Sequence, residues 1–239
     1  ISIVHHIVSD GWTIGVLLQE VMGNYKNNCL NVTTTEPELT IQYKDFSAWL
    51  TKKLEGDFGE RARKFWDRKK MAEVEPLDLP YDFSRPAMND FEGAKIKNYF
   101  DSEFYSDIEL LARKNQTTVF NVFRAGLSLA FHKWANQKEV MVGTPADGRS
   151  HHQLANQMGL YVNTLPLKST YNSDSTFADY LKQISIDSLE TFKFQDYPLD
   201  LILEANPADR DTSRSPLFDV LMVVQNTAIG DGTVQITEQ

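Results

Sequence analysis

The sequence predicts an α/β protein, and three observations carry this prediction. Apolar residues recur at helical spacing in several long segments. Short apolar runs separate these segments, and proline and glycine cluster between them. The chain has 239 residues, 41% of them hydrophobic and 24% charged, which is ordinary for a globular protein. This length allows one large domain or two lobes.

The first predicted element is a strand over residues 1–8 that leads into a turn and a helix. Adjacent side chains of a strand point to opposite faces, so His5 and His6 cannot converge on one metal ion. We therefore expect one of them to be held structurally and the other to face a cavity. Ser9 and Asp10 both suit an N-cap, and Gly11 suits the tight turn. An amphipathic helix is then predicted by apolar residues at positions 14, 17, 18, 21, 22 and 25.

The middle of the chain combines helices with an irregular crossing. Helical periodicity predicts helices over residues 43–54 and 58–71. Three prolines mark a crossing from about 75 to 93. Alternation predicts a strand over 95–100, and residues 106–109 match a capping box that would open a short helix.

The second half begins with a long aromatic helical pattern capped by Thr117 or Thr118, which we expect to be a core helix. Pro166 indicates that the strand containing it lies at the edge of its sheet. The remaining predicted elements are strands over 139–143, 160–167 and 217–225 and a helix over 176–192. Helices and strands thus alternate along most of the chain, as an α/β fold requires.

Composition excludes several classes of function. The net charge of −9 argues against binding nucleic acid or an anionic membrane, which needs clustered cations. No apolar run approaches the ~18 residues that span a bilayer, and no secretory signal is visible. The single cysteine, Cys29, fits a reducing compartment, so we expect a cytoplasmic protein. The chain begins at Ile1 inside a predicted strand, and we expect it to be part of a longer polypeptide.

The candidate chemistry centres on His6. There is no glycine-rich phosphate loop and no serine in a nucleophile elbow. His151 and His152 are adjacent in a predicted loop without carboxylates at ligand spacing, so we expect no metal site. A neutral histidine beside a helix N-terminus can act as a general base. A core histidine satisfied by hydrogen bonds is the alternative reading of the same residue.

Five segments together resemble one known family. Residues 4–13, Val-His-His-Ile-Val-Ser-Asp-Gly-Trp-Thr, resemble the active-site motif of condensation domains of nonribosomal peptide synthetases, relatives of chloramphenicol acetyltransferase. The other segments that resemble family motifs, in the family's order, are 43–49, 158–166, 195–200 and 210–217.

The resemblance implies a two-lobed chloramphenicol acetyltransferase-like fold with an incomplete N-terminal lobe. The family's upstream Arg-His-Glu motif is not in the sequence. By this likeness, residues 1–75 form the C-terminal part of the N-lobe, 76–100 the crossing between lobes, and 101–239 a C-lobe that is truncated at its end. We expect this segment alone to be inactive.

The implied function is amide-bond formation between a carrier-bound acyl or peptidyl thioester and a carrier-bound aminoacyl acceptor. The implied partners are upstream and downstream peptidyl carrier proteins and an adjacent adenylation domain. The carriers hold the substrates on phosphopantetheine, and the domain itself is expected to bind no cofactor.

The same resemblance assigns roles to individual residues. His6 would deprotonate or orient the attacking amine, and backbone amides near Gly11 would bind the oxyanion. The remaining assignments are His5, Asp10 and Arg149 as structural support of the site and Trp49 and Asn163 as substrate-channel residues. In particular, we expect Asp10 to fix the turn through an arginine, for which Arg149 is one candidate and an arginine of the missing lobe is the other.

Two other functions share the histidine motif. An epimerisation domain of the same assembly line would use it to move an α-proton, although residues 162–166 resemble the condensing type better. A catalytically silent domain that docks carrier proteins is the non-enzymatic alternative, against which the intact motif argues.

Overall fold

The computed structural model describes residues 3–32, 38–88, 92–207, 211–225 and 234–238. The chain divides by its internal contacts into two units. The first unit comprises Ile1–Ala62 and Ala146–Asn163, and the second comprises Arg63–Pro145 and Thr164–Gln239. The lobe boundaries that the sequence suggests stay a prediction about the complete domain.

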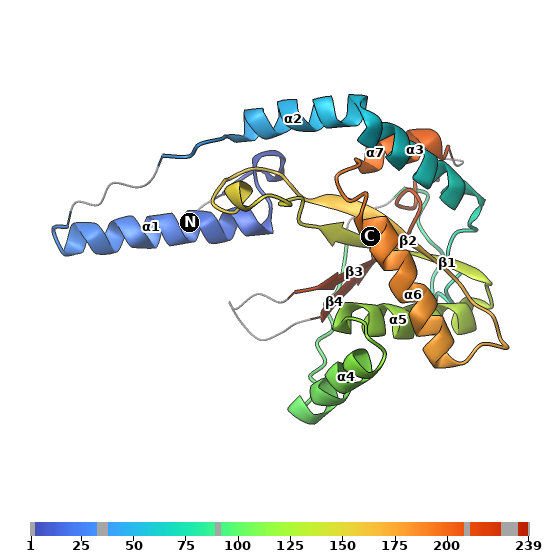
Figure 1. The fold of residues 1–239 in the computed structure, drawn as a ribbon. Helices are drawn as coiled ribbons and strands as arrows, with labels where there is room; N and C mark the ends of the chain where they lie inside the picture. Colours follow the sequence, from blue (N-terminus) through green and yellow to red (C-terminus); the bar gives the residue numbers. More distant parts are fainter. Residues whose placement is uncertain (1–2, 33–37, 89–91, 208–210, 226–233, 239) are drawn as a thin grey trace. The chain divides into compact units, whose positions relative to one another are not determined.

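The first unit contains the predicted N-terminal helices and a returning loop. Its helices are α1 (Gly11–Cys29), α2 (Tyr43–Glu55) and the start of α3 (Asp57–Lys69). Asp10 caps α1 by accepting a hydrogen bond from Thr13 N at 2.8 Å. Figure 1 shows the loop of residues 146–163, in yellow, beside the first turn of α1. This loop therefore completes the unit from a distant part of the sequence.

The second unit is built on a four-stranded sheet of order β2-β1-β3-β4. β1 and β3 are parallel, with Gly143 opposite Leu221, and β3 and β4 are antiparallel. The strands are β1 (Glu139–Ala146), β2 (Asn163–Thr170), β3 (Val220–Val224) and β4 (Val234–Glu238). β2 lies at the edge, as predicted from its Pro166, because an edge strand tolerates a missing amide donor.

Helices pack against this sheet through one apolar cluster and against one another through a second. Figure 1 shows α4 (Ser102–Lys114), α5 (Val119–Ala135) and α6 (Phe177–Phe192) grouped beside it. Phe131 of α5 packs with the buried strand residues Val140, Val142, Val220 and Met222. The other cluster joins the three helices through Ala112, Val122, Ala125, Tyr180, Leu181 and Ile184. α5 is therefore the core helix that its aromatic pattern predicted.

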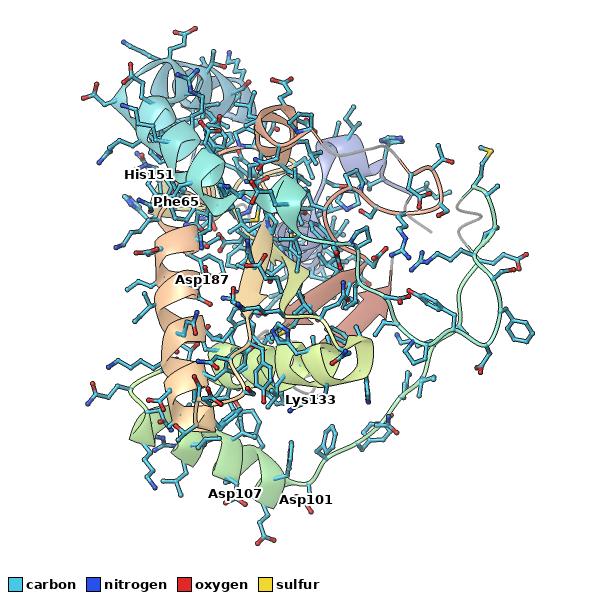
Figure 2. The ribbon with its side chains drawn as sticks, turned by 90° about the vertical axis from the view of Figure 1, so that its right-hand side faces the viewer. Phe65, Asp101, Asp107, Lys133, His151 and Asp187 are labelled. Carbon is cyan, nitrogen blue, oxygen red and sulfur yellow. The ribbon has the colours of Figure 1, made fainter. Side chains whose placement is uncertain are left out.

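A buried charge joins α5 to α6. The Arg124 side chain is fully buried, and its Nη2 lies 2.7 Å from Asp187 Oδ2. Lys69 forms a second ion pair with Asp187, which Figure 2 labels on α6. The guanidinium also donates to Ser188 Oγ at 2.6 Å and to Lys168 O at 3.0 Å. Paired in this way, the buried cation fixes α6 and the end of β2 to the core helix.

Three predictions of secondary structure are wrong. The strand predicted over 1–8 is absent from its described part, because residues 3–5 are irregular and His6–Val8 form a 3-10 turn. Residues 95–100 are extended but belong to no strand. α4 begins at Ser102, capped by Asp101, and not at the predicted capping box, whose Asp107 lies within the helix (Figure 2).

The apolar face of α1 is a further difference. Its predicted apolar residues are largely exposed in the described structure, and the residues of α1 that are buried are Thr13 and Val16. The sequence pattern also gave no sign of α7 (Leu199–Ala205) or of β4. α7 is only about two turns long, and so few residues are too short a stretch for helical periodicity to stand out in the sequence.

The buried His132 of α5 should make stability depend on pH. Its Nδ1–H donates to Gln137 O at 2.8 Å, so Nε2 accepts from Ser169 Oγ at 3.1 Å. Burial lowers the pKa of His132 below its ordinary 6.5, and the hydrogen bond to Gln137 and the charge of Glu139 oppose this only in part. As the pH falls below 6.5, the unfolded chain takes up a proton before the folded chain does.

We therefore expect the free energy of unfolding to decrease from about pH 7 down to the lowered pKa of His132. Urea unfolding of the chain at a series of pH values measures this slope. A His132→Gln variant, which cannot titrate, should show a shallower slope between pH 7 and pH 5. Equal slopes in the two proteins would mean that His132 titrates alike in both states.

Candidate active site

The two histidines lie on a short turn that hydrogen bonds within itself. His5 Nδ1 accepts from Ile7 N at 3.1 Å, while Val8 N donates to His5 O at 3.1 Å. Within the described part of the chain, the His6 imidazole makes no hydrogen bond or ion pair, and it is exposed. The turn thus uses His5 for its own structure and leaves the ring of His6 accessible to a substrate.

Asp10 anchors this turn through both oxygens of its carboxylate. Oδ1 accepts from Thr13 N, and Oδ2 accepts from Tyr161 N at 3.1 Å. Arg149 Nη2 lies 3.2 Å from Oδ1 and 3.3 Å from Oδ2, and both side chains are buried. Asp10 and Arg149 are 139 residues apart in the sequence, so this ion pair ties the start of α1 to the returning loop.

Hydrogen bonds, together with the ion pair, keep Asp10 charged. Burial alone would raise the pKa of this carboxyl group, but hydrogen bonds from the backbone amides of Thr13 and Tyr161 and from the Thr13 hydroxyl lower it. The charge of Arg149 lowers it further, and the net result is a pKa below the ordinary 3.8. Asp10 is therefore an ionised acceptor at neutral pH and not a proton donor.

The loop also holds the Arg149 guanidinium. Its Nη1 donates to Leu154 O at 2.5 Å and to Gln157 O at 2.9 Å, and its Cζ lies 4.1 Å from the centroid of the Tyr161 ring. The preceding Gly148 has a φ of +65°, and a Cβ there would lie 1.8 Å from Tyr161 O. Glycine at this position allows the close approach that brings the guanidinium to Asp10.

An aromatic row extends from this cluster along α2. The ring centroids of Phe46 lie 4.8 Å from Tyr161 and 5.8 Å from Trp49. Trp49 is 37% exposed, and it packs edge-on against His151 at 5.3 Å. Lys53 Nζ lies 4.5 Å from the centroid of the Trp49 ring. Trp49 is thus held in a fixed orientation with part of its ring open to solvent.

The structure brings some of the expected site residues together and leaves others apart. Asp10 and Arg149 touch, and the aromatic row connects Trp49 to the same cluster. Asn163 opens β2 two residues after Tyr161. Gly11 is the first residue of α1, where backbone amides lack intrahelical partners. His6 lies outside this network of contacts, five residues before Gly11.

Sequence reasoning missed Thr13, Gln157 and Tyr161 as members of this cluster. Tyr161 donates to Gln157 Oε1 at 2.5 Å, and Gln157 Nε2 donates to Ile41 O at 2.6 Å. Burial raises the pKa of Tyr161, so its hydroxyl remains a donor at neutral pH. The one usable signal was the position of Thr13, three residues after the N-cap, where side chains meet the capping residue.

The structure offers neither a metal centre nor a membrane span among its described residues. In that part of the chain, histidine, cysteine, aspartate and glutamate side chains form no group of three that could hold a metal ion. Likewise, none of the helices described is both long and apolar enough to cross a membrane.

Comparison with known proteins identifies relatives of the whole chain. The family model "Condensation domain" matches residues 1–239. Gramicidin S synthase 2 of Brevibacillus brevis is 35% identical over 223 residues, covering 93% of this chain but 5% of that protein. Surfactin synthase subunit 1 of Bacillus subtilis is 36% identical over 231 residues, covering 97% of this chain and 6% of that subunit. The chain therefore spans a small part of the length of these synthetases.

Solved structures share the fold. Holo-AB3403, a four-domain nonribosomal peptide synthetase bound to AMP and glycine, gives a TM-score of 0.81 at 24% identity over 95% of this chain and 17% of that one. The first condensation domain of the calcium-dependent antibiotic synthetase, in complex with a substrate analogue, gives 0.73 at 17% identity over 94% of this chain and 55% of that one. At these identities the likeness shows the fold alone.

Proposed function

The chain belongs to the condensation domain family of nonribosomal peptide synthetases, and from this premise we propose that it forms an amide bond between two carrier-bound substrates. The donor is an acyl or peptidyl thioester on the phosphopantetheine of an upstream carrier protein. The acceptor is an aminoacyl thioester on a downstream carrier, next to an adenylation domain. The observation that supports this is the exposed His6 on a turn anchored by the buried Asp10–Arg149 pair.

The proposed reaction is a balanced acyl transfer. The acceptor amine attacks the donor carbonyl, a C–N bond forms, and the C–S bond breaks as the tetrahedral intermediate collapses. The amine proton passes to His6, and a proton is returned to the departing thiolate. The α-amino group has an ordinary pKa of about 7.7–8.0, so part of it is already neutral, and therefore nucleophilic, near pH 7.

His6 supplies only part of the acceleration. General base catalysis contributes on the order of 10²–10⁴-fold, whereas holding two reactants together can supply about 7–11 kcal/mol. The developing oxyanion needs donors, and we assign the amide of Gly11 at the start of α1 to this role. Trp49 and Asn163 belong to the proposed substrate channel.

The test uses the synthetase that contains this domain, with the donor carrier loaded with an acyl group and the acceptor carrier with an amino acid. Mass spectrometry of the acceptor carrier should show the amino acid extended by the donor group. Inversion of a donor α-carbon without a new amide would indicate an epimerisation domain. If both carriers bind and neither product forms, the domain is a silent docking platform.

A further inference from the structure

The hydroxyl group of Thr13 joins three segments of the first unit. Thr13 is 3% exposed, and its Oγ1 lies 2.8 Å from Asp10 Oδ1 and 2.8 Å from Gly159 O. The same oxygen accepts from Gly159 N at 3.0 Å and from Arg149 Nη2 at 3.3 Å. One side-chain oxygen thus contacts the cap of α1, the buried guanidinium and a backbone segment 146 residues away.

This arrangement exceeds what a helix cap requires. The cap of α1 is complete once the Thr13 amide donates to Asp10, and that bond needs no particular side chain at position 13. The hydroxyl oxygen adds a bond by accepting from the Gly159 amide, and its single proton can be donated to Asp10 Oδ1 or to Gly159 O, each at 2.8 Å. A Cβ on residue 159 would lie 2.4 Å from Tyr43 Cδ2, so glycine there permits this close packing.

Thr13 and Asp10 act on the backbone as a pair. Their side chains bind the amides of Gly159 and Tyr161, which are two residues apart, as the backbone of a neighbouring strand would. The segment they hold leads directly to Asn163 at the start of β2. The position of the start of α1 is therefore fixed against the segment that carries a proposed channel residue.

The same anchor determines where the His6 turn lies. Ser9 is buried beside Asp10, its amide donates to His6 O at 3.2 Å, and its hydroxyl donates to His5 O at 3.2 Å. The remaining hydrogen bonds of the histidine turn are internal. The turn is therefore fixed through Ser9 and Asp10 to the residues that Thr13 binds.

We infer that Thr13 is a positioning residue, whose hydroxyl holds the His6 turn in register with the segment leading to Asn163. The inference rests on the function proposed above. Thr13 does not touch the reacting groups, so its loss should misplace His6 without removing the base. Misplacement by about 1 Å can lower a rate by roughly 100-fold, because reacting atoms must meet at short distance.

The test replaces Thr13 by valine and by serine in the loaded synthetase. Valine keeps the shape but leaves the Gly159 amide without this acceptor, and serine keeps the hydroxyl. We expect Thr13→Val to lower kcat for condensation by roughly 10- to 100-fold with the KM for the acceptor carrier unchanged. Thr13→Ser should keep kcat within about threefold of the unmodified protein, since the serine hydroxyl can make the same hydrogen bonds as the threonine hydroxyl.

Thr144→Val is the matched control, because Thr144 is also buried and its hydroxyl donates to Met222 O at 2.9 Å, in the sheet of the second unit. The Thr144→Val enzyme also loses a buried hydroxyl hydrogen bond, and it should keep the kcat of the unmodified protein for condensation. Equal losses in the two valine variants, or a Thr13→Val enzyme with unchanged kcat, would overturn the inference. If Thr13→Val does not fold, Thr13→Ala replaces it, since the space left beside polar groups can hold water.

These outcomes are distinct from failure of the proposed function. If the unmodified synthetase forms no amide from loaded carriers, the proposal of condensation is wrong. If it forms amide and responds to His6→Ala but not to Thr13→Val, condensation stands and the positioning role of Thr13 is wrong.

Discussion

Replacing His6 by alanine is expected to lower the rate of amide formation by the intact synthetase on the order of 10²–10⁴-fold, the contribution of a well-placed general base. In the described part of the structure, this replacement removes the imidazole without removing a contact that stabilises the fold. The His6 imidazole is exposed and makes no hydrogen bond within the described residues, so its removal should leave folding intact. Single-turnover formation of the extended acceptor, measured with both carriers loaded, reports the chemical step directly.

The second histidine pair provides the control. His152 is an exposed histidine in the same unit. It lies in a short 3-10 turn, His152–Leu154. His152→Ala removes the same side chain outside the proposed reaction and should leave turnover unchanged. Unchanged turnover in His6→Ala as well would show that His6 is not the base.

A different result is expected for His5. Its Nδ1 accepts the amide of Ile7, so His5→Ala removes a bond that shapes the turn and leaves the ring of His6 present. A partial loss that falls short of the effect of His6→Ala fits the structural role that we assign to it. The two adjacent histidines would then differ because of their hydrogen bonds and not because of their chemistry.

Local signals in the sequence were enough to predict most helices. Asp10, Thr118 and Thr176 each cap the helix that follows, because a short polar side chain binds a free amide wherever the chain turns into a helix. The edge position of β2 also followed from one residue, Pro166. Such features depend on a few neighbouring residues, so they can be predicted without knowing the rest of the fold.

Strand predictions failed where the partner was decisive. Residues 3–8 and 95–100 alternate as strands do, yet no described strand pairs with either segment. A strand needs a neighbour for its backbone hydrogen bonds, and periodicity does not say whether one is present. Residues 5–9 instead form bonds between near neighbours, which gives the 3-10 turn. The sequence therefore indicated that the two histidines matter, but it did not predict the conformation of the backbone at these residues.

The candidate site was predicted in part for a similar reason. Asp10 and Arg149 could be suggested as partners, since a carboxylate beside a tight turn is placed to fix it through an arginine, and the structure places them in contact. The roles of Thr13 and Tyr161 depend on a loop that returns from more than 130 residues away. No local pattern encodes that approach, and only the folded chain displays it.

The buried ion pair leads to the other large expected effect. Breaking such a pair from one side leaves an uncompensated buried charge, at a cost of about 3–5 kcal/mol. Asp10→Asn and Arg149→Met should each destabilise the domain by about this amount and lower its soluble yield, since both side chains are buried. The pKa of Asp10 lies below its ordinary value, so the pair should persist above pH 3.8 and weaken as the pH falls through the lowered pKa.

A double-mutant comparison separates anchoring from catalysis. If the two residues stabilise the fold by pairing, the Asp10→Asn/Arg149→Met protein should lose less than the sum of the single losses, because neither charge is then left alone. Glu73→Gln, in the exposed Lys70–Glu73 pair, makes the same carboxylate-to-amide change and should alter stability little. An Asp10→Asn protein that is soluble and normally stable but inactive would contradict the anchoring role, because the carboxylate would then act on the substrates and not on the turn that presents His6.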